Sequence, residues 1–365
     1  MKLKRFAKLV VLHVAKAAGV LALLRVVTRT QARVLCYHGG NIGDECHFNP
    51  KLFCTAEHLE QRLRWLRAKG FVPTSLDEAA NLRPRVNTGI PVALTLDDGW
   101  YSSGRDLLPL MAKYAHRPVL YLHTEVYETG TPVIPVCLGY IFWKAGPKKV
   151  TLAGFDPAMD GHWQLADPVQ QRRLRAAVEG WLGEQSPRLL AECIVRFATA
   201  LGLPASSLDL SSRRFSYMTN EELHAAVAAG CTIEMHGHSH KYIVGEPASN
   251  RMNIEACRAR ILDAGLDQPR HYCYPSGVFD AEAANTLRAL NIATATTCLP
   301  GLIAADDTDA RFFLPRFLDG GNVSMIEFEA EMSGLLHVIR ALLKRRSMRN
   351  VVVQESELEL THSSV

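Results

Sequence analysis

The chain has 365 residues, of which 48% are hydrophobic and 21% are charged. This composition excludes intrinsically disordered, collagen-like and low-complexity proteins. The formal net charge is +4, but residues 1–43 carry eight Lys and Arg side chains and no Asp or Glu. Subtracting this +8 from +4 leaves −4 for residues 44–365, so a basic arm precedes a mildly acidic body.

Residues 1–32 form this arm, and they predict a basic amphipathic helix. Lys16 and Arg25 interrupt its apolar stretch, so no run of about 20 uncharged residues is available to span a bilayer. We expect residues 1–30 to lie on an anionic membrane surface, with the Lys and Arg side chains snorkelling to one side. Two alternatives remain open, namely a helix packed on the domain and an export signal. A nucleic-acid partner is disfavoured, because the body is acidic and lacks a basic and aromatic groove pattern.

The nine cysteines are scattered singly, and no two lie within four residues of each other. An odd number without C-x-x-C spacing predicts free thiols in a reducing compartment, and it argues against a metal site built from cysteines. Together with the basic arm, this predicts a cytoplasmic protein held peripherally at the inner face of a bacterial membrane.

From residue 33 onward, short apolar runs alternate with amphipathic helical segments, which is the pattern of βα units and predicts an α/β fold. In chain order, the expected strands are residues 34–37, 71–73, 91–96, 119–122 and 231–235, followed by strands that end near residues 275, 297 and 316. The expected helices of this part are residues 55–70, 104–114 and 219–230. The first of them is capped by Thr55 and the last begins with a capping box, Thr219 to Glu222.

Residues 125 to about 215 break this rhythm, and they are interpreted as a mainly helical insertion within a barrel of residues 33–320. Residues 321–353 are expected to form a C-terminal helix. Residues 354–365, which are rich in Ser and Glu, are expected to be a disordered tail.

Polar residues follow the predicted strands at the end that is the active face of α/β barrels. Thr95-Leu96-Asp97-Asp98-Gly99 ends one strand, and two adjacent carboxylates there can point toward a metal and toward a water. The plainer interpretation of this segment is a turn. His236-Gly237-His238-Ser239-His240 follows another strand, and imidazoles combined with a carboxylate are typical of a Zn²⁺ site with one open position. Its plainer interpretation is a polar loop.

Together the two segments resemble the polysaccharide deacetylase superfamily (NodB homology, carbohydrate esterase family 4). Thr95 to Gly99 is similar to the family's Thr-Phe-Asp-Asp-Gly motif, and His236 and His240 are similar to its His-x-x-x-His pair. The family's third motif, Arg-x-Pro-aromatic-Gly, is half present in Cys273-Tyr274-Pro275-Ser276-Gly277. Tyr37-His38 and Leu314-Pro315-Arg316-Phe317 also look like this superfamily. The resemblance covers about residues 33–320 and implies a distorted (β/α) barrel with a helical insertion.

The resemblance further implies a metal-dependent hydrolase that removes an N-acetyl or other acyl group from an amino sugar. Asp98, His236 and His240 would bind a divalent ion, expected to be zinc, with cobalt, manganese or nickel as alternatives. Asp97 would act as the general base on a water activated by the ion. Tyr274, Pro275, Ser276 and Gly277 would form one wall of the sugar groove.

Two family positions differ in this sequence. The third-motif arginine, which orients the base, falls on Cys273, and Arg316 is the candidate to replace it. The family's general acid lies in a Leu-x-His motif, and Leu335-Leu336-His337 matches it only in letters, because this segment lies in a helical apolar stripe. His38 and His238 are the candidates for that role.

The resemblance implies an amino sugar of a polysaccharide or lipid-linked glycan precursor as the substrate. The basic arm and the free cysteines favour a lipid-linked or nucleotide-linked glycan intermediate over a finished extracellular polymer. Two other functions stay open at the level of the sequence. The same site could hydrolyse another C–N bond, such as a formamide or an imide. Alternatively, the chain could be a catalytically decayed, membrane-attached protein that binds glycans.

Overall fold

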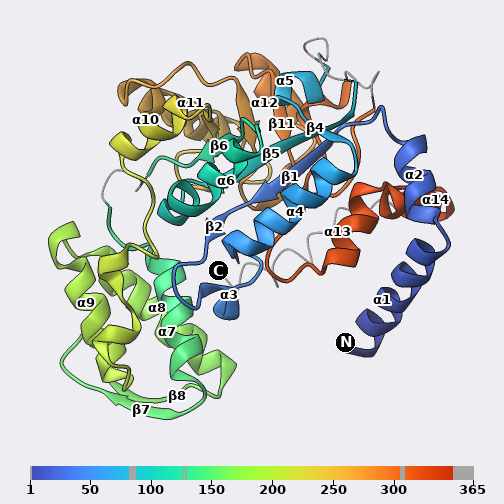
Figure 1. The fold of residues 1–365 in the computed structure, drawn as a ribbon. Coiled ribbons are helices and arrows are strands. Elements are labelled where there is room, and N and C mark those ends of the chain that lie inside the picture. The colour runs from blue at the N-terminus through green and yellow to red at the C-terminus, as the bar shows by residue number, and fades with distance from the viewer. Residues whose placement is uncertain (1, 82–87, 126, 128–129, 305–308, 348–365) are drawn as a thin grey trace.

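The structure is a computed structural model that describes residues 2–81, 88–125, 127, 130–304 and 309–347. Its centre is a parallel sheet that curls into the distorted (β/α) barrel expected from the sequence, with helices on the outside (Figure 1). From one edge to the other, its strands are β11 (Thr294–Thr296), β10 (His271–Cys273), β9 (Thr232–Met235), β6 (Val119–Leu122), β5 (Ile90–Asp98), β1 (Arg33–Tyr37) and β12 (Phe317–Leu318), and β4 (Phe71–Pro73) also pairs with β5.

The longest strand, β5, is buried at every residue. A parallel strand covered on both faces needs a nearly continuous apolar run, and residues 90–96 supply one. Tyr37 of β1 pairs with Leu96, and Leu122 of β6 pairs with Asp98 on the other edge. Met235 of β9 pairs in turn with Leu122. The residues that follow β1, β5, β6 and β9 therefore meet at one end of the barrel.

Helices follow the strands and pack outside the sheet (Figure 1). They are α3 (Glu45–Phe48), α4 (Ala56–Ala68), α5 (Leu76–Ala79), α6 (Leu108–Lys113), α10 (Asn220–Ala228), α11 (Pro247–Asp263) and α12 (Ala283–Ala289). The predicted caps are confirmed: the Thr55 hydroxyl accepts a hydrogen bond from the backbone N–H of His58 at 3.1 Å, and Thr219 and Glu222 form a capping box. A small parallel pair, β2 (Gly39–Gly40) with β3 (Phe53–Cys54), extends the chain beyond β1.

The segment 314–318 differs from the prediction of a strand that ends at Arg316. Leu314 forms only an isolated parallel bridge with Thr296 of β11, and β12 begins at Phe317, which pairs with Leu35 of β1. Pro315 has no N–H to donate, which interrupts strand pairing between these two contacts. The segment therefore contacts β11, at one edge of the sheet, and β1, beside the other edge, and holds Arg316 between these contacts.

The insertion forms a lobe beside the sheet, at the lower left of Figure 1. It contains α7 (Ile134–Ala145), the antiparallel hairpin of β7 (Lys149–Leu152) and β8 (Gly161–Gln164), α8 (Pro168–Gly183) and α9 (Pro187–Ala200). Arg214 at the end of the lobe pairs with Asp44 of the barrel at 2.6 Å, and the Tyr140 hydroxyl of α7 donates to the same carboxylate at 2.8 Å. These contacts join the lobe to the loop after β2.

The predictions of one helix for residues 1–32 and one for residues 321–353 are wrong, since each region forms two helices. The arm contains α1 (Lys2–Ala17) and α2 (Val20–Val27), which meet at 75° across Gly19. The C-terminal region contains α13 (Met325–Met332) and α14 (Leu335–Ser347), separated at Gly334. Both glycines have positive φ, +75° and +86°, which ends a right-handed helix at low cost only for glycine. The predicted tail, residues 354–365, lies outside the described residues.

In the described chain, no single helix is long and apolar enough to cross a bilayer. Two bent pairs of helices reach that length and hydropathy together, namely α1 with α2 and α9 with the turns at residues 205–212.

The arm packs on α13 through a side with both apolar and charged residues, and Leu12 and Leu21 are buried there against Ile326 and Ala330. Arg5 and Lys8 pair with Glu327 at 3.2 and 3.0 Å, and Lys16 pairs with Glu329 at 2.7 Å. The opposite side of α1 is apolar and exposed; its members are Phe6, Val10, Val11 and Val14, at 45–66% exposure. Three cations of the arm thus pair with carboxylates of α13, as expected for the alternative of a helix packed on the domain.

Candidate metal centre

Asp98 ends β5 in a backbone conformation that sets the direction of its side chain. Its φ is +74° and that of Gly99 is +97°, both in the left-handed region that is costly for a residue with a side chain. One carboxylate oxygen, Oδ2, accepts a hydrogen bond from the Trp100 indole N–H at 2.8 Å. The other, Oδ1, is buried and has no hydrogen-bond partner among the described residues. Asp98 is thus held by one oxygen and presents the other to the site.

His236 and His240 point their Nε2 atoms at this free oxygen. His236 follows β9 directly, and its Nδ1 bonds the backbone carbonyl of Cys273 at 2.9 Å, which leaves the lone pair of Nε2 facing the site. The two Nε2 atoms lie 3.5 and 3.3 Å from Asp98 Oδ1 and 3.2 Å from each other. Two imidazole nitrogens and a carboxylate oxygen in a triangle are a donor set that fits a divalent transition metal with positions left open.

The charge states of these groups also suit a cation. Burial lowers the pKa of His236 to about 4, so its imidazole is neutral at pH 7. Burial alone would raise the pKa of Asp98, but His240, His38 and His236 hold it well below its usual range. Burial opposes protonation of His240, yet Asp98 raises the pKa of this histidine above its ordinary value. Binding of a divalent ion to His240 would require its Nε2 to be free of a proton.

Asp97, next to the metal centre, forms a buried ion pair with Arg316. Arg316 Nη1 and Nη2 donate to the two carboxylate oxygens at 2.7 and 2.8 Å, and the Arg316 side chain is fully buried. The remaining donors bond the Thr297 carbonyl and the Thr95 hydroxyl at 3.0 Å each. Burial raises the pKa of Asp97, but Arg316 outweighs it and holds that pKa well below its usual range. Asp97 is therefore an ionised carboxylate with a fixed orientation.

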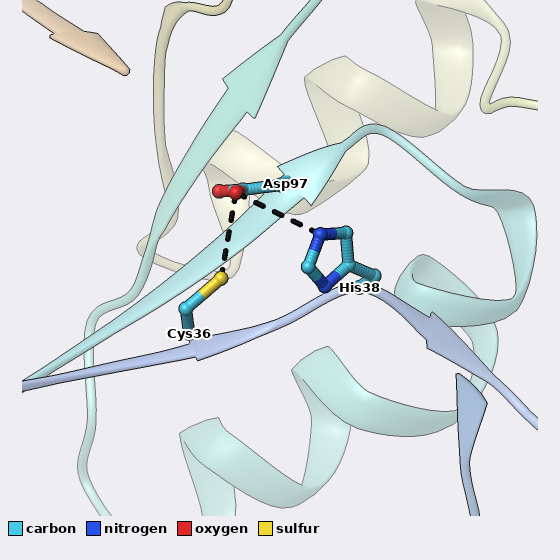
Figure 2. Close-up of side chains that lie close together, drawn as sticks. All are labelled: Cys36, His38 and Asp97. Carbon is cyan, nitrogen blue, oxygen red and sulfur yellow. Dashed lines mark hydrogen bonds and ion pairs between the residues drawn. The ribbon is translucent and has the colours of Figure 1, made fainter. Parts of the chain in front are cut away.

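Cys36 and His38, at the end of β1, point at the same carboxylate (Figure 2). The Cys36 Sγ lies 3.4 Å and the His38 Nε2 lies 3.8 Å from Asp97 Oδ2. The side chain of His38 is 18% exposed, whereas that of Asp97 is 3% exposed. His38 thus lies between the buried carboxylate and the surface.

The predicted groove wall, residues 274–277, is only partly at the surface. The expectation that Tyr274 and Pro275 contact a sugar is wrong, because both are buried and the Tyr274 ring packs among Phe279, Phe313 and Tyr242. Of the four residues, only Ser276 is exposed and Gly277 is half-buried.

Two further histidines that the sequence offered for the role of general acid, His238 and His337, lie in different places. The Nδ1 of His238 is 3.0 Å from the Thr124 hydroxyl after β6, beside the metal centre. His337 of α14 lines a cleft with Val27 and Thr28, at the amino end of β1 and therefore opposite the site. This placement separates the Leu335-Leu336-His337 segment from Asp97.

His123 belongs to the site and was not identified from the sequence. It directly follows β6, is buried, and packs its ring 5.1 Å from that of His240 and 4.6 Å from that of Tyr217. Neither of its ring nitrogens has a hydrogen-bond partner among the described residues, and burial lowers its pKa to about 3. Its position after the predicted strand 119–122, where the other site residues also follow strands, is the signal that could have revealed it.

Comparison with known proteins points to one family. The family model described as polysaccharide deacetylase matches residues 199–295, the part with His236 and His240. No curated protein sequence matches the chain. Among solved structures, the Streptococcus pyogenes deacetylase PplD in complex with acetate is similar with a TM-score of 0.53 and 13% identity, covering 84% of this chain and 99% of that one. IcaB from Ammonifex degensii is similar with a TM-score of 0.50 and 16% identity, covering 83% and 97%.

Proposed function

We propose that this chain, which matches the polysaccharide deacetylase family model over residues 199–295 and is similar in fold to the deacetylase PplD and to IcaB, is a hydrolase that removes N-acetyl groups from an amino-sugar glycan with the help of a divalent metal. One observation carries the proposal. The unpartnered oxygen of Asp98 meets the Nε2 atoms of His236 and His240 directly beside the Asp97–Arg316 pair. A metal ligand set and an ionised carboxylate are thus adjacent, as hydrolysis of an amide requires.

Asp98, His236 and His240 would hold the ion. When bound, a divalent ion supplies Lewis acidity, which activates a water and polarises the amide carbonyl. The side chain of His240 is 37% exposed, while those of His236 and Asp98 are 3% and 7% exposed. Substrate and water would therefore reach the site from the side of His240.

Asp97 is the proposed general base. Its ionised carboxylate accepts the proton of the attacking water while oxygen bonds to the amide carbon. His38, whose Nε2 is 3.8 Å from the same carboxylate, is the proposed donor of a proton to the amine as the C–N bond breaks. The products are acetate and the free amino sugar. One water is consumed, and the proton that Asp97 takes from it passes to His38 and replaces the proton that His38 gives to the leaving amine.

Arg316 acts through Asp97 and is a positioning residue. Two parallel hydrogen bonds fix the plane of the carboxylate, and the guanidinium keeps it ionised inside the barrel. The segment 314–318, which contacts both β11 and β1, brings this arginine to the place that Cys273 leaves without a cation.

The proposal predicts that Asp97→Asn retains the metal and loses activity. We expect kcat on N-acetylglucosamine oligosaccharides to fall about 100- to 10,000-fold, because the proton of the attacking water then has no acceptor. Release of acetate and of free amine is measured with the metal-loaded protein, and metal content is measured alongside. Asp267→Asn, which changes an exposed carboxylate outside the site, is the matched control. Equal activity of Asp97→Asn and wild type would remove Asp97 from the reaction, and an inactive, metal-free wild type would overturn the proposed function.

We also propose that the chain lies at the cytoplasmic face of a bacterial membrane and acts on a lipid-linked glycan precursor. The exposed apolar side of α1 supports this placement, since Phe6, Val10 and Val14 are 66%, 45% and 63% exposed. These side chains lie on the helix face turned away from α13, where an interfacial helix buries its apolar residues in lipid. All nine cysteines are free thiols, which suits a reducing compartment.

Co-sedimentation with vesicles that contain anionic lipid tests this placement. The triple variant Phe6→Ser, Val10→Ser, Val14→Ser should bind at least about tenfold more weakly, since each burial contributes roughly 1–2 kcal/mol. The matched control is Val169→Ser with Leu189→Ser, which removes two exposed apolar side chains from the insertion. Equal binding by the triple variant, or no binding by the intact chain, contradicts the membrane placement and leaves the chemistry untouched.

A further inference from the structure

We propose that Cys36, His38 and Asp97 form a second metal site, which takes a thiophilic divalent ion such as Zn²⁺, Co²⁺ or Cd²⁺ and blocks catalysis when it is occupied. The three side chains come from the carboxyl ends of two neighbouring strands, β1 and β5, and converge on one point (Figure 2). None of them belongs to the triangle of Asp98, His236 and His240.

The distances fit one ion. The Cys36 Sγ, the His38 Nε2 and a carboxylate oxygen of Asp97 all lie within 4.8 Å of one another. Tetrahedral zinc, with Zn–S of about 2.3 Å and Zn–N and Zn–O of about 2.0 Å, places sulfur and oxygen ligands about 3.5 Å apart and nitrogen and oxygen ligands about 3.3 Å apart. The observed separations are 3.4 Å from Cys36 Sγ to Asp97 Oδ2 and 3.8 Å from His38 Nε2 to the same oxygen. His38 would have to approach Asp97 Oδ2 by about half an ångström to reach the separation of zinc ligands.

A competing group of donors nearby is less suited to an ion. Asp97, His236 and Cys273 also lie within 4.8 Å of one another, but His236 is already a member of the first centre. In addition, Arg316 Nη2 lies 2.9 Å from the Cys273 Sγ, so a guanidinium occupies the direction from which a second cation would approach that sulfur. The Cys36 Sγ, by contrast, contacts Asp97 Oδ2 and the Tyr37 carbonyl and receives no hydrogen bond from the guanidinium among the described residues.

The site also has an entrance. Cys36 and Asp97 are buried, but the His38 side chain is 18% exposed and reaches toward the surface. Binding breaks the S–H bond of Cys36, forms a sulfur–metal bond and releases one proton to solvent, with no change of oxidation state. The new thiolate adds a negative charge beside the Asp97 carboxylate, which keeps its hydrogen bonds to Arg316, and His38 contributes a neutral nitrogen.

Inhibition is expected because the second ion binds atoms that take part in the reaction. The inhibition, unlike the binding, rests on the proposed function. An ion at this site binds Asp97 Oδ2 and His38 Nε2, the proposed base and the proposed proton donor. Activity should therefore rise with the first equivalent of metal and fall with the second. The binding itself stands on the geometry of Cys36, His38 and Asp97 and does not require that the chain be a deacetylase.

Titration of the metal-free protein with Co²⁺ tests the second site. A thiolate ligand gives cobalt a near-ultraviolet sulfur-to-metal charge-transfer absorption, which the nitrogen and oxygen ligands of the first centre do not give. We expect this absorption at the second equivalent in the wild type and its loss in Cys36→Ser. Cys193→Ser, which changes a half-buried thiol on α9 in the insertion, is the matched control and should keep it. His240→Ala, which weakens the first centre, should keep it as well.

Two outcomes overturn the proposal: no charge-transfer absorption in the wild type at two equivalents, or the same absorption in Cys36→Ser. In activity assays, the Zn²⁺ concentration that inhibits by half should rise about tenfold or more in Cys36→Ser. An active deacetylase without the absorption contradicts only the second site. A protein with the absorption and without activity on any acetamido sugar contradicts only the proposed function.

Discussion

The barrel end and the arm both rely on pairs of cations and carboxylates, but they bury them differently. In the Arg316–Asp97 pair the two side chains are 0% and 3% exposed, and every donor of the guanidinium has a partner. In the arm, Arg5 and Lys8 are 54% and 49% exposed where they meet Glu327. A buried pair has a fixed geometry and is costly to break, whereas an exposed pair is weak and screened by salt. The barrel end therefore keeps its charged side chains in a fixed arrangement, whereas salt or acid can weaken the ion pairs of the arm.

The largest stability effect expected from this difference is at Arg316. Arg316→Met leaves the Asp97 carboxylate buried without its partner, and we expect the free energy of unfolding to fall by about 3–5 kcal/mol. Unfolding in urea at pH 7 measures it. Adding Asp97→Asn to Arg316→Met should recover a large part of the loss, because both charges are then absent. A loss below about 1 kcal/mol in the single variant would place this pair in the same class as the exposed pairs of the arm.

The acid sensitivity of the barrel end is the next effect in size. Burial lowers the pKa of His123 to about 3, below its usual value of 6.5. Between pH 3 and pH 6.5, the unfolded chain therefore binds a proton at this histidine and the folded chain does not. The stability that depends on neutral His123 is therefore complete above pH 6.5 and is lost as the pH falls from 6.5 toward 3. His123→Phe should make the free energy of unfolding less steep with pH in this range, by up to about 1.4 kcal/mol per pH unit. Parallel pH profiles of variant and wild type would contradict this.

The smallest effect is expected in the arm. Glu327→Gln removes the partner of Arg5 and Lys8, and we expect it to weaken docking of α1 on α13 by no more than about 1 kcal/mol. Hydrogen exchange in α1 should become faster in the variant at low salt and should be nearly equal in the two proteins at 1 M salt. A difference that persists at high salt would show that the arm is held like the barrel end.

Acid should act on the arm in a lower pH range than on the barrel end. Burial raises the pKa of Glu327, but hydrogen bonds from Ser324 and Lys8 lower this pKa by a larger amount. The result is a pKa of about 2, below the ordinary value of 4.5. Because this folded-state pKa is depressed, the contribution of Glu327 is complete above pH 4.5 and is lost as the pH falls toward 2. Hydrogen exchange in α1 should therefore accelerate below pH 4.5, whereas unfolding linked to His123 begins near pH 6.5. Acceleration that begins at pH 6.5 would contradict a separate role for Glu327.

The sequence predicted what depends on local pattern. The buried run of residues 90–96 identified β5, and the polar residues after it placed Asp97 and Asp98 at the strand end. The capping residues Thr55 and Thr219 likewise marked the starts of α4 and α10. In each case, neighbouring residues contain the physical cause, so the pattern was sufficient.

Contacts that depend on strand register were harder to predict from the sequence. The lack of closely spaced cysteines in the sequence argued against cysteine as a metal ligand. Cys36 nevertheless contacts Asp97, 61 positions away, because Cys36 pairs with Thr95 in the sheet. The burial of Tyr274 depends on the distant Phe313, which no local pattern includes. The breaks at Gly19 and Gly334 are positive-φ positions inside apolar stretches, where periodicity predicts a continuous helix.

The central claim, that the strand ends hold a catalytic metal, is tested most directly by calorimetric titration of metal-free protein with Zn²⁺. The account predicts a tight first equivalent in the wild type, weakened about 100-fold or more in Asp98→Asn and retained in Asp97→Asn, because only Asp98 lies in the triangle with His236 and His240. A wild type that binds no ion, or an Asp98→Asn variant that binds as tightly as the wild type, would contradict it.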